Sequence, residues 1–195
     1  MSETLLVAGV DEVGRGALFG PVVAAAVILP PTAVTSLKQL GVRDSKRLSP
    51  KKRIDLSQQI RTMAIDCQVG LASVREIDRL NILQATLLAM RRSILRLNPQ
   101  PQLCLIDGNQ SIPNLLIQQQ TIVKGDQTSI AIASASIIAK VWRDQLIIRL
   151  ARKYPEYDLI QNKGYGTKKH RDALQIYGAS PQHRLSFRPC QVLKL

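Results

Sequence analysis

The stretch that decides the fold spans residues 5–29 and reads LLVAGVDEVGRGALFGPVVAAAVIL. Residues 5–10 are apolar and compatible with a β-strand, and residues 22–29 are typical of a strand that is buried on both faces. Two acids, Asp11 and Glu12, follow the first run directly. Glycines punctuate the segment between the runs at Gly14, Gly16 and Gly20. The stretch therefore predicts two buried strands joined through a glycine-rich turn that begins beside a pair of acids.

The remainder of the chain mixes short apolar runs with longer stretches of helical periodicity. Ser49-Pro50 is typical of a helix start, and Ser73-x-x-Glu76 matches a capping box. These and similar signals predict helices over residues 49–66, 73–97 (with a restart at Asn81), 128–153 and 167–177, and strands over 67–71, 103–106 and 115–123. Strands come early and helices dominate later, which favours an α/β layered domain with a mixed central sheet flanked by helices, plus a C-terminal helical segment. Because repeats and linkers are lacking, we expect a single domain over residues 1–195.

The charge of the chain indicates a polyanionic partner. Lys and Arg number 27 against 14 Asp and Glu among 195 residues, so the formal net charge is +13 and the pI is about 10.2. Nucleic acid is the usual partner of such a chain, and a basic protein without such a partner is the alternative. Residues 140–195 hold 12 Lys and Arg against 4 Asp and Glu, which places +8 of the net charge there. We expect this mainly helical, basic C-terminal part to help bind a duplex.

Composition also indicates the cellular compartment of the protein and excludes several kinds of chain and metal site. A hydrophobic content of 45% excludes a disordered chain. Three cysteines without a close pair indicate reduced thiols, and two histidines exclude a histidine-rich metal site. The start lacks a signal peptide's basic region, and the apolar run at 22–29 is far too short to span a bilayer. We expect a soluble cytoplasmic protein with no membrane partner, in which His170 is a surface helix residue rather than a catalytic one.

Four acids stand at predicted strand ends or turns of a chain that is poor in acids: Asp11, Glu12, Asp107 and Asp126. Ligand sites of α/β proteins collect at strand ends, and carboxylates that converge there repel one another unless a divalent cation lies between them. Oxygen ligands suit Mg²⁺ or Mn²⁺ better than zinc. The alternative is that each acid is a solvated turn residue or a helix cap, Asp126 above all. Neighbouring strand residues also point to opposite faces, so Asp11 and Glu12 share a site only if the strand ends or bulges there.

The glycine turn superficially resembles a dinucleotide-binding fingerprint, through Gly14-x-Gly16-x-x-x-Gly20. That fingerprint needs a helix N-terminus for the pyrophosphate, but Pro21 and a second strand-like run follow. Two carboxylates directly before the turn would also repel a phosphate. The turn is therefore not interpreted as a cofactor site.

Taken together, blocks along nearly the whole chain resemble type 2 ribonuclease H (ribonuclease HII) in its bacterial form. The blocks are AGVDEVGRG at 8–16, DSK at 44–46, EIDxxNIL at 76–83, IDGN at 106–109, KGD at 124–126, ASIIAKV at 135–141 and KGY at 163–165. Each is weak alone, but their order and spacing are specific. The resemblance implies a ribonuclease H-like fold and an endonuclease that hydrolyses the RNA strand of RNA–DNA hybrids. It further implies incision 5′ of single ribonucleotides in duplex DNA, leaving 3′-OH and 5′-phosphate ends, with roles in DNA repair, DNA replication and RNA primer removal.

The resemblance also implies roles for individual residues. Asp11, Glu12, Asp107 and Asp126 match metal-binding carboxylates that hold two divalent cations, Mg²⁺ or Mn²⁺, and we take Asp11 as the bridging ligand. Gly14-Arg15-Gly16 matches a loop whose backbone recognises the ribose 2′-OH, and Tyr165 matches a tyrosine that stacks on the sugar of the following deoxynucleotide. The residues that match phosphate contacts are Lys46, Asn81, Ser136 and Lys140. One departure is Gln127-Thr128, where many members have serine next, and it leaves the acids unaffected.

Selectivity for ribose has a physical basis in the same turn. The 2′-OH donates and accepts hydrogen bonds, so a turn that offers backbone groups can recognise it, and Arg15 can bind the adjacent phosphate. Three alternatives remain: a binding module that does not cut, a two-metal nuclease or integrase acting on DNA alone, and a type 3 ribonuclease H, whose extra N-terminal domain is not expected here. Residues 186–195 contain no clear sliding-clamp peptide, and we expect a monomer.

Overall fold

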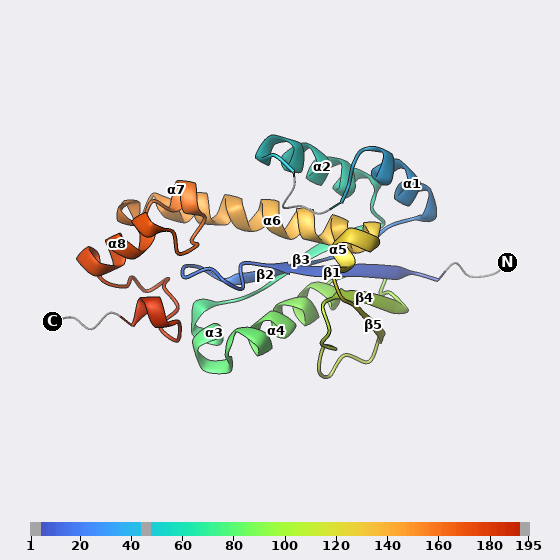
Figure 1. The fold of residues 1–195 in the computed structure, drawn as a ribbon. Coiled ribbons are helices and arrows are strands. Elements are labelled where there is room, and N and C mark those ends of the chain that lie inside the picture. Colours follow the sequence, from blue (N-terminus) through green and yellow to red (C-terminus); the bar gives the residue numbers. More distant parts are fainter. Residues whose placement is uncertain (1–4, 44–47, 192–195) are drawn as a thin grey trace.

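A computed structural model describes residues 5–43 and 48–191, which form a mixed five-stranded sheet between layers of helices (Figure 1). The strands lie in the order β3-β2-β1-β4-β5. β1 pairs antiparallel with β2 and parallel with β4, β2 pairs antiparallel with β3, and β4 pairs parallel with β5. The strand bounds are Val7–Val13 (β1), Val22–Ile28 (β2), Asp66–Ala72 (β3), Leu103–Asp107 (β4) and Gln118–Ile122 (β5). The predicted α/β layered fold with a mixed sheet is confirmed.

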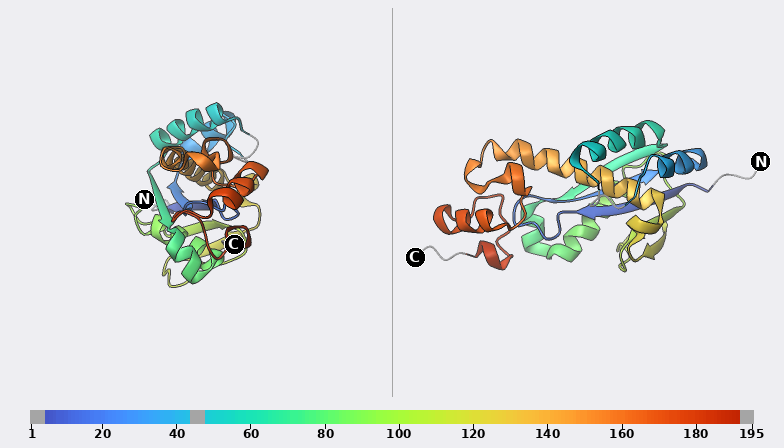
Figure 2. Two further views of the ribbon diagram at one scale, coloured as in Figure 1. Left: turned by 90° about the vertical axis from the view of Figure 1, so that its left-hand side faces the viewer. Right: turned by 45° about the horizontal axis from the view of Figure 1, so that its top comes forward.

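Helices cover both faces of the sheet. α6 lies along one face with α1 and α2 beyond it, and α3 and α4 cover the other face (Figures 1 and 2). The α-helices are Pro31–Gln39 (α1), Pro50–Met63 (α2), Val74–Leu80 (α3), Ile82–Ile94 (α4), Gly125–Thr128 (α5), Ile130–Ala151 (α6), Leu159–Asn162 (α7) and Lys168–Tyr177 (α8). Short 3₁₀ helices are Pro155–Tyr157 (η2) and Arg188–Cys190 (η3). None of these helices in the described residues is long and apolar enough to cross a membrane.

β2 shows why the sheet is layered on both sides. All seven of its residues are buried, as the apolar run predicts. Ala24 and Ala26 belong to the core under α4, whereas Val23 and Ala25 belong to the core under α6. Close packing against α6 also requires Gly9, since a Cβ there would lie 2.1 Å from the Ala131 carbonyl carbon.

Helix boundaries follow local capping more closely than hydrophobic periodicity. The predicted capping box is present, because the Ser73 hydroxyl accepts from the Glu76 N–H (3.3 Å) and Glu76 Oε2 accepts from the Ser73 N–H (2.8 Å). The predicted restart at Asn81 within the helical stretch 73–97 is also present, since Asn81 adopts φ 70° and caps α4. α1 carries no signal that the prediction used, and it was missed.

The C-terminal segment packs at one end of α6, away from the N-terminus (Figure 2). Phe19, Ile147, Leu159 and Leu174 are buried together there in a third core. α8 begins after Thr167 and ends at Gly178, as predicted. The prediction that His170 is a surface residue is wrong: its exposed fraction is 0%, because residues 180–184 fold back over α8 and cover it.

Candidate active site

Three acids converge at the end of the two central parallel strands. Asp11 and Glu12 lie near the end of β1, and Asp107 is the last residue of β4. One ligand oxygen from each carboxylate lies within 4.8 Å of the other two. We call Asp11, Glu12 and Asp107 the acid cluster. Its spacing allows one cation to contact all three carboxylates.

The register of the sheet explains how two neighbouring strand residues reach one site. β1 neither bulges nor ends before Glu12, since its pairing with β2 continues through Val13. The predicted requirement for a break in this strand is therefore wrong. Pairing of β1 with β4 stops at Val10, which leaves the β1 edge open beside Asp11 and Glu12. Side chains from opposite faces of β1 can meet across this open edge, where β4 ends in Asp107.

Burial raises the pKa of the two β1 acids, Asp11 and Glu12. Asp11 is 5% exposed, and burial raises its pKa well above the usual range, with the charges of Glu12 and Asp107 adding to the rise. The Ser136 hydroxyl and the Glu12 N–H (2.7 Å) donate to the Asp11 carboxylate and partly offset this effect. Burial also raises the pKa of Glu12, against the opposing charge of Arg15. The cluster thus lacks enough positive charge of its own to stabilise three ionised carboxylates.

Asp126 is the fourth predicted acid, and it lies in the same pocket without joining the close cluster. It is 7% exposed and belongs to α5, whose start is tied to β4 because the Gly125 N–H donates to Asp107 Oδ1 (2.7 Å). The prediction that Asp126 could cap the long helix is wrong, since Ser129 caps α6. Asp126 and the acid cluster line a pocket of about 530 Å³ together with Ser136, Lys140 and Tyr165.

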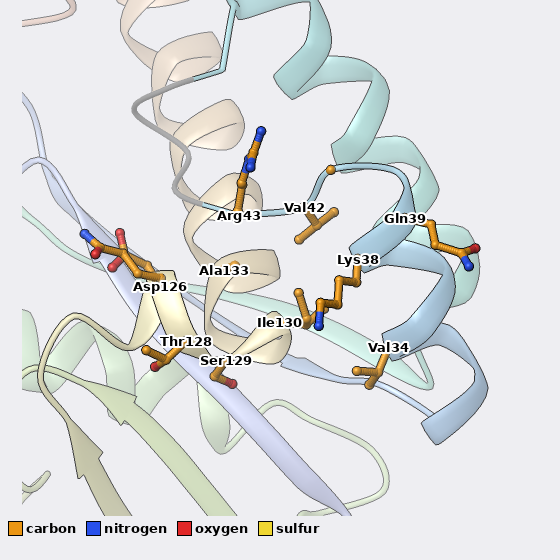
Figure 3. Close-up of a pocket in the computed structure, with 12 residues that line it drawn as sticks. Val34, Lys38, Gln39, Val42, Arg43, Asp126, Thr128, Ser129, Ile130 and Ala133 are labelled. Atoms are coloured by element: carbon orange, nitrogen blue, oxygen red, sulfur yellow. The ribbon is translucent and has the colours of Figure 1, made fainter.

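Asp126 also borders a second and larger pocket, of about 860 Å³, between α1 and the start of α6 (Figure 3). Lys38 and Arg43 supply positive charge on the α1 side of this pocket, and Ser129 lies on the other side. Asp126 therefore lies between the pocket of the acid cluster and this second pocket, which is lined by Lys38 and Arg43.

The Gly14-Arg15-Gly16 turn follows the acid cluster directly. Gly14 adopts φ 89°, and a Cβ there would lie 2.2 Å from Arg143 Nε, so both backbone and packing require glycine. At Gly16, by contrast, a Cβ would meet no atom within 4 Å. Arg15 is half-exposed, and its Nη1 lies 3.4 Å from Glu12 Oε1. The turn thus presents an open backbone at Gly16 next to an accessible guanidinium.

Two buried arginines hold this turn, and the sequence analysis missed both. Arg143 donates to the carbonyls of Pro21 (3.1 Å), Phe19 (2.9 Å) and Lys163 (2.9 Å). Arg184 donates to the carbonyls of Gly20 (3.0 Å) and Arg15 (2.9 Å). Both side chains are fully buried. No periodicity distinguishes such an arginine from the exposed ones of a basic chain, because its carbonyl partners are distant in sequence.

The other predicted substrate contacts are distributed around the acid pocket. The Tyr165 ring centroid lies 5.6 Å from Lys140 Nζ and 5.5 Å from Arg143 Cζ, and Lys140 also pairs with Asp144 at 2.9 Å. Asn81 lies outside the residues that line the pocket, at the start of α4, where its Oδ1 accepts from the Gln84 N–H. Lys46 lies outside the described residues.

Comparison with known proteins agrees with this fold. A family model described as Ribonuclease HII matches residues 8–190. The chain belongs to the ribonuclease HII family. It is therefore a ribonuclease H, an endoribonuclease that hydrolyses RNA within RNA–DNA hybrids. Family membership also decides against a binding module that does not cut.

Individual ribonucleases HII are similar to this chain over most of their own length. Those of Trichodesmium erythraeum and Nostoc sp. are each 66% identical to this chain, covering 96% of it and 89% and 83% of the relatives. Among solved structures, ribonuclease H2 from Pyrococcus horikoshii OT3 is 27% identical with a TM-score of 0.82, covering 96% of both chains. Ribonuclease HII from Archaeoglobus fulgidus, determined in a complex with PCNA, is 30% identical with a TM-score of 0.75, covering 89% of this chain and 88% of that one.

Proposed function

We propose that this ribonuclease HII incises duplex DNA on the 5′ side of single embedded ribonucleotides, besides cutting longer RNA–DNA hybrids, and leaves 3′-OH and 5′-phosphate ends. One observation carries the proposal: Asp11 and Glu12 of the acid cluster are followed within a few residues by the glycine turn, whose backbone is open at Gly16. A phosphodiester held at the acids therefore lies next to the groups that would recognise its ribose.

The acid cluster fits divalent cations. Its donors are all carboxylate oxygens within 4.8 Å of one another, which suits Mg²⁺ or Mn²⁺, and its raised pKa values show that positive charge is lacking there. Asp11, Glu12, Asp107 and Asp126 would hold two such cations, with Asp11, the most buried of the four, at the centre of the ligand set. Bound there, the cations would supply an activated water for in-line attack and neutralise the charge of the leaving 3′-oxygen.

Residues of the chain itself would position the substrate. Ser136 orients the Asp11 carboxylate by donating to it, and we propose that it also contacts a backbone phosphate. The backbone of Gly14-Arg15-Gly16 would pair with the 2′-OH, and those groups would lack a partner against deoxyribose, which can support discrimination of about 10⁴. The half-exposed Arg15 guanidinium would bind the adjacent phosphate. Tyr165 would stack on the sugar of the following deoxynucleotide.

We propose that basic and amide groups around this site bind the backbone of the duplex. Lys140 lines the acid pocket, and Asn81, whose Oδ1 is engaged in capping, would use its amino group toward a phosphate. We propose that residues 140–195, within one domain spanning residues 1–195, hold the nucleic acid through their +8 charge, and that Lys46 contributes another phosphate contact.

The biological setting proposed for this chain is removal of ribonucleotides from DNA and of RNA primers, in repair and replication within the cytoplasm. The Archaeoglobus fulgidus protein is known in a complex with PCNA. For this chain we propose action as a monomer without a sliding-clamp peptide in residues 186–195.

Cleavage of a defined duplex tests the proposal. Purified protein is incubated with Mg²⁺ or Mn²⁺ and an end-labelled DNA duplex that contains one ribonucleotide, beside an all-DNA duplex and a long RNA–DNA hybrid. We expect a single cut 5′ of the ribonucleotide, whose 3′-OH end a polymerase can extend, and no cut in the all-DNA duplex. Cutting of the hybrid alone, or of all three substrates, would contradict the proposed junction specificity.

Two variants assign the residues in the same assay. Asp11→Asn should abolish incision while duplex binding, measured by gel shift, stays largely intact. Asp172→Asn is the matched control, because this exposed acid pairs with Lys168 on the surface of α8. Incision by Asp11→Asn at a rate near wild type would show that the acids are wrongly assigned.

A further inference from the structure

Two buried histidines connect the C-terminal segment to the backbone of Tyr165. The Nε2 atoms of His170 and His183 lie 2.9 Å apart. His170 Nδ1 lies 3.0 Å from the Tyr165 carbonyl oxygen, and His183 Nδ1 lies 2.9 Å from the Ser180 backbone nitrogen. The two rings thus form one continuous chain of hydrogen bonds from Ser180 to Tyr165.

The backbone groups at the two ends of this hydrogen-bond chain determine which nitrogen of each ring carries a proton. A backbone N–H can only donate, so His183 Nδ1 accepts from Ser180 and carries no proton. The proton of a neutral His183 is then on Nε2, which donates to His170 Nε2. His170 in turn carries its proton on Nδ1 and donates to the Tyr165 carbonyl, which can only accept. Both ends require the same pair of tautomers.

The surroundings keep both rings neutral. The exposed fractions are 0% for His170 and 1% for His183. The rings of Phe19 and Tyr157 pack against His183 with centroids 5.0 Å and 4.6 Å away. Protonation of His170 would also set two donors against each other at the Nε2 contact. Burial correspondingly lowers the pKa of both histidines, that of His183 to about 4.

The Tyr165 backbone depends on such external support. Lys163 and Gly164, the two residues before it, both adopt left-handed φ values of 51° and 83°. Its carbonyl accepts from the Thr167 N–H at 2.8 Å as well as from His170, so both acceptor positions are filled. With the carbonyl held in this way, the tyrosine side chain is directed into the pocket that contains the acid cluster.

The other end of the hydrogen-bond chain is attached to residues 18–20, in the segment between the glycine turn and β2. The Arg184 N–H donates to the Leu18 carbonyl and the Gly20 N–H to the Gln182 carbonyl. His183 also pairs with Phe19 as an isolated β-bridge. Tyr165 also pairs directly with Ala17 as an isolated β-bridge, and the Gly164 carbonyl accepts from the Leu18 N–H at 2.8 Å. The histidine pair therefore adds a second connection between Tyr165 and the segment that follows the glycine turn.

We propose that His183 and His170 are positioning residues, which fix Tyr165 relative to the Gly14-Arg15-Gly16 turn through a neutral hydrogen-bond relay with defined tautomers. The proposal rests on the proposed function in one respect, the role of Tyr165 at the ribose–deoxyribose junction. It predicts that loss of the relay selectively weakens incision at single ribonucleotides, while cutting of a long hybrid is largely retained.

The tautomers provide a test that does not involve activity. Long-range ¹H–¹⁵N NMR of the ¹⁵N-histidine-labelled protein near neutral pH should show both rings neutral, with His170 protonated on Nδ1 and His183 on Nε2. A charged ring, or the opposite tautomer in either residue, would overturn the relay.

Kinetics test the positioning role. His170→Phe removes both hydrogen bonds of the ring, whereas His170→Asn keeps an amide donor near the position of Nδ1. We expect His170→Phe to lower kcat/KM at a single embedded ribonucleotide about tenfold more than on a long hybrid. His170→Asn restores the bond to the Tyr165 carbonyl but not the link to His183, so it should recover only part of the difference. Circular dichroism establishes that each variant is folded, and NMR of the wild type together with His170→Asn keeps the test decisive should His170→Phe fail to fold.

The Tyr165→Ala background separates this proposal from the proposed function. Tyr165→Ala alone should lower junction incision selectively, and adding His170→Asn or His170→Phe should change that preference no further, since both act through one group. Equal losses on both substrates in the His170 variants, with Tyr165→Ala still selective, would overturn the relay's role alone. An unchanged preference in Tyr165→Ala would overturn the proposed role of Tyr165 and the positioning role with it.

Discussion

Neutralising Asp11 should stabilise the cation-free protein while it abolishes cleavage. The carboxylate oxygens of the acid cluster lie within 4.8 Å of one another. At an effective dielectric constant of about 20, two ionised groups at that separation repel by about 3 kcal/mol. Asp11 faces two such neighbours, and burial together with their charges raises its pKa, so its ionised form is disfavoured in the folded chain. We therefore expect Asp11→Asn to gain about 1–3 kcal/mol at about pH 8, which corresponds to a Tm increase of roughly 2–12 °C in a chain of this length.

Asparagine is the appropriate substitution because it conserves the local hydrogen bonds. Its side-chain oxygen can still accept from the Glu12 N–H, and its amino group can donate to the Ser136 hydroxyl. The gain should shrink as the pH falls toward 3.8, the ordinary pKa of the aspartate carboxyl, because a protonated Asp11 no longer repels its neighbours. Asp172→Asn, on an exposed surface pair, should change stability by less than about 1 kcal/mol.

Thermal unfolding with EDTA and with excess Mg²⁺ or Mn²⁺ measures both effects. Cation binding to the folded state should raise the wild-type Tm, since a ligand at about 100 times its Kd contributes about 2.7 kcal/mol. Asp11→Asn should lose most of that increase. A variant that is less stable than wild type in EDTA, or that keeps the full cation-induced increase, would refute both the repulsion and the metal assignment.

Three further predictions concern packing and pH. Gly9→Ala should lower the free energy of unfolding in urea by about 3 kcal/mol or more because its Cβ would enter the α6 backbone, whereas Gly16→Ala, which faces open space, should change it by less than about 1 kcal/mol. Stability should fall as the pH drops from 6.5 to about 4, since unfolded His183 binds a proton near 6.5 and the buried ring only near 4; His183→Asn should flatten this part of the profile. The hydrogen-bonded pair with Arg92 lowers the pKa of Glu76 from 4.5 to about 2. The stabilisation from this pair is therefore complete above pH 4.5 and is lost as the pH falls toward 2. Glu76→Gln should abolish this part of the pH dependence in acid unfolding.

Much of the fold and of the site is local in origin and therefore readable from the sequence. The buried strand β2, the capping box at Ser73 and Glu76, and the ends of α8 all depend on residues a few positions apart. The four acids were found because acids are scarce in this chain and these stand at strand ends and turns, and short blocks in a fixed order indicated the family before any coordinates were considered.

Features that depend on distant partners were missed or misjudged. His170 has a helical, polar neighbourhood in sequence, and only the return of residues 180–184 over α8 makes it buried. Arg143 and Arg184 look like two more cations of a basic chain, yet all but one of the carbonyls that accept from them are more than a hundred residues away. Burial of a polar group depends on which segments the fold brings over it.

The sequence by itself determined the chemical inventory: a mixed α/β layered fold, acids at strand ends, a glycine turn and a large positive charge. The tertiary structure decided how that inventory is assembled. Asp11 and Glu12 point to opposite faces of an unbroken strand and still meet Asp107, because β4 ceases to pair with β1 at Val10 and opens the strand edge. That edge is a property of sheet register, which depends on how two strands nearly a hundred residues apart align, and no local pattern of residues specifies it.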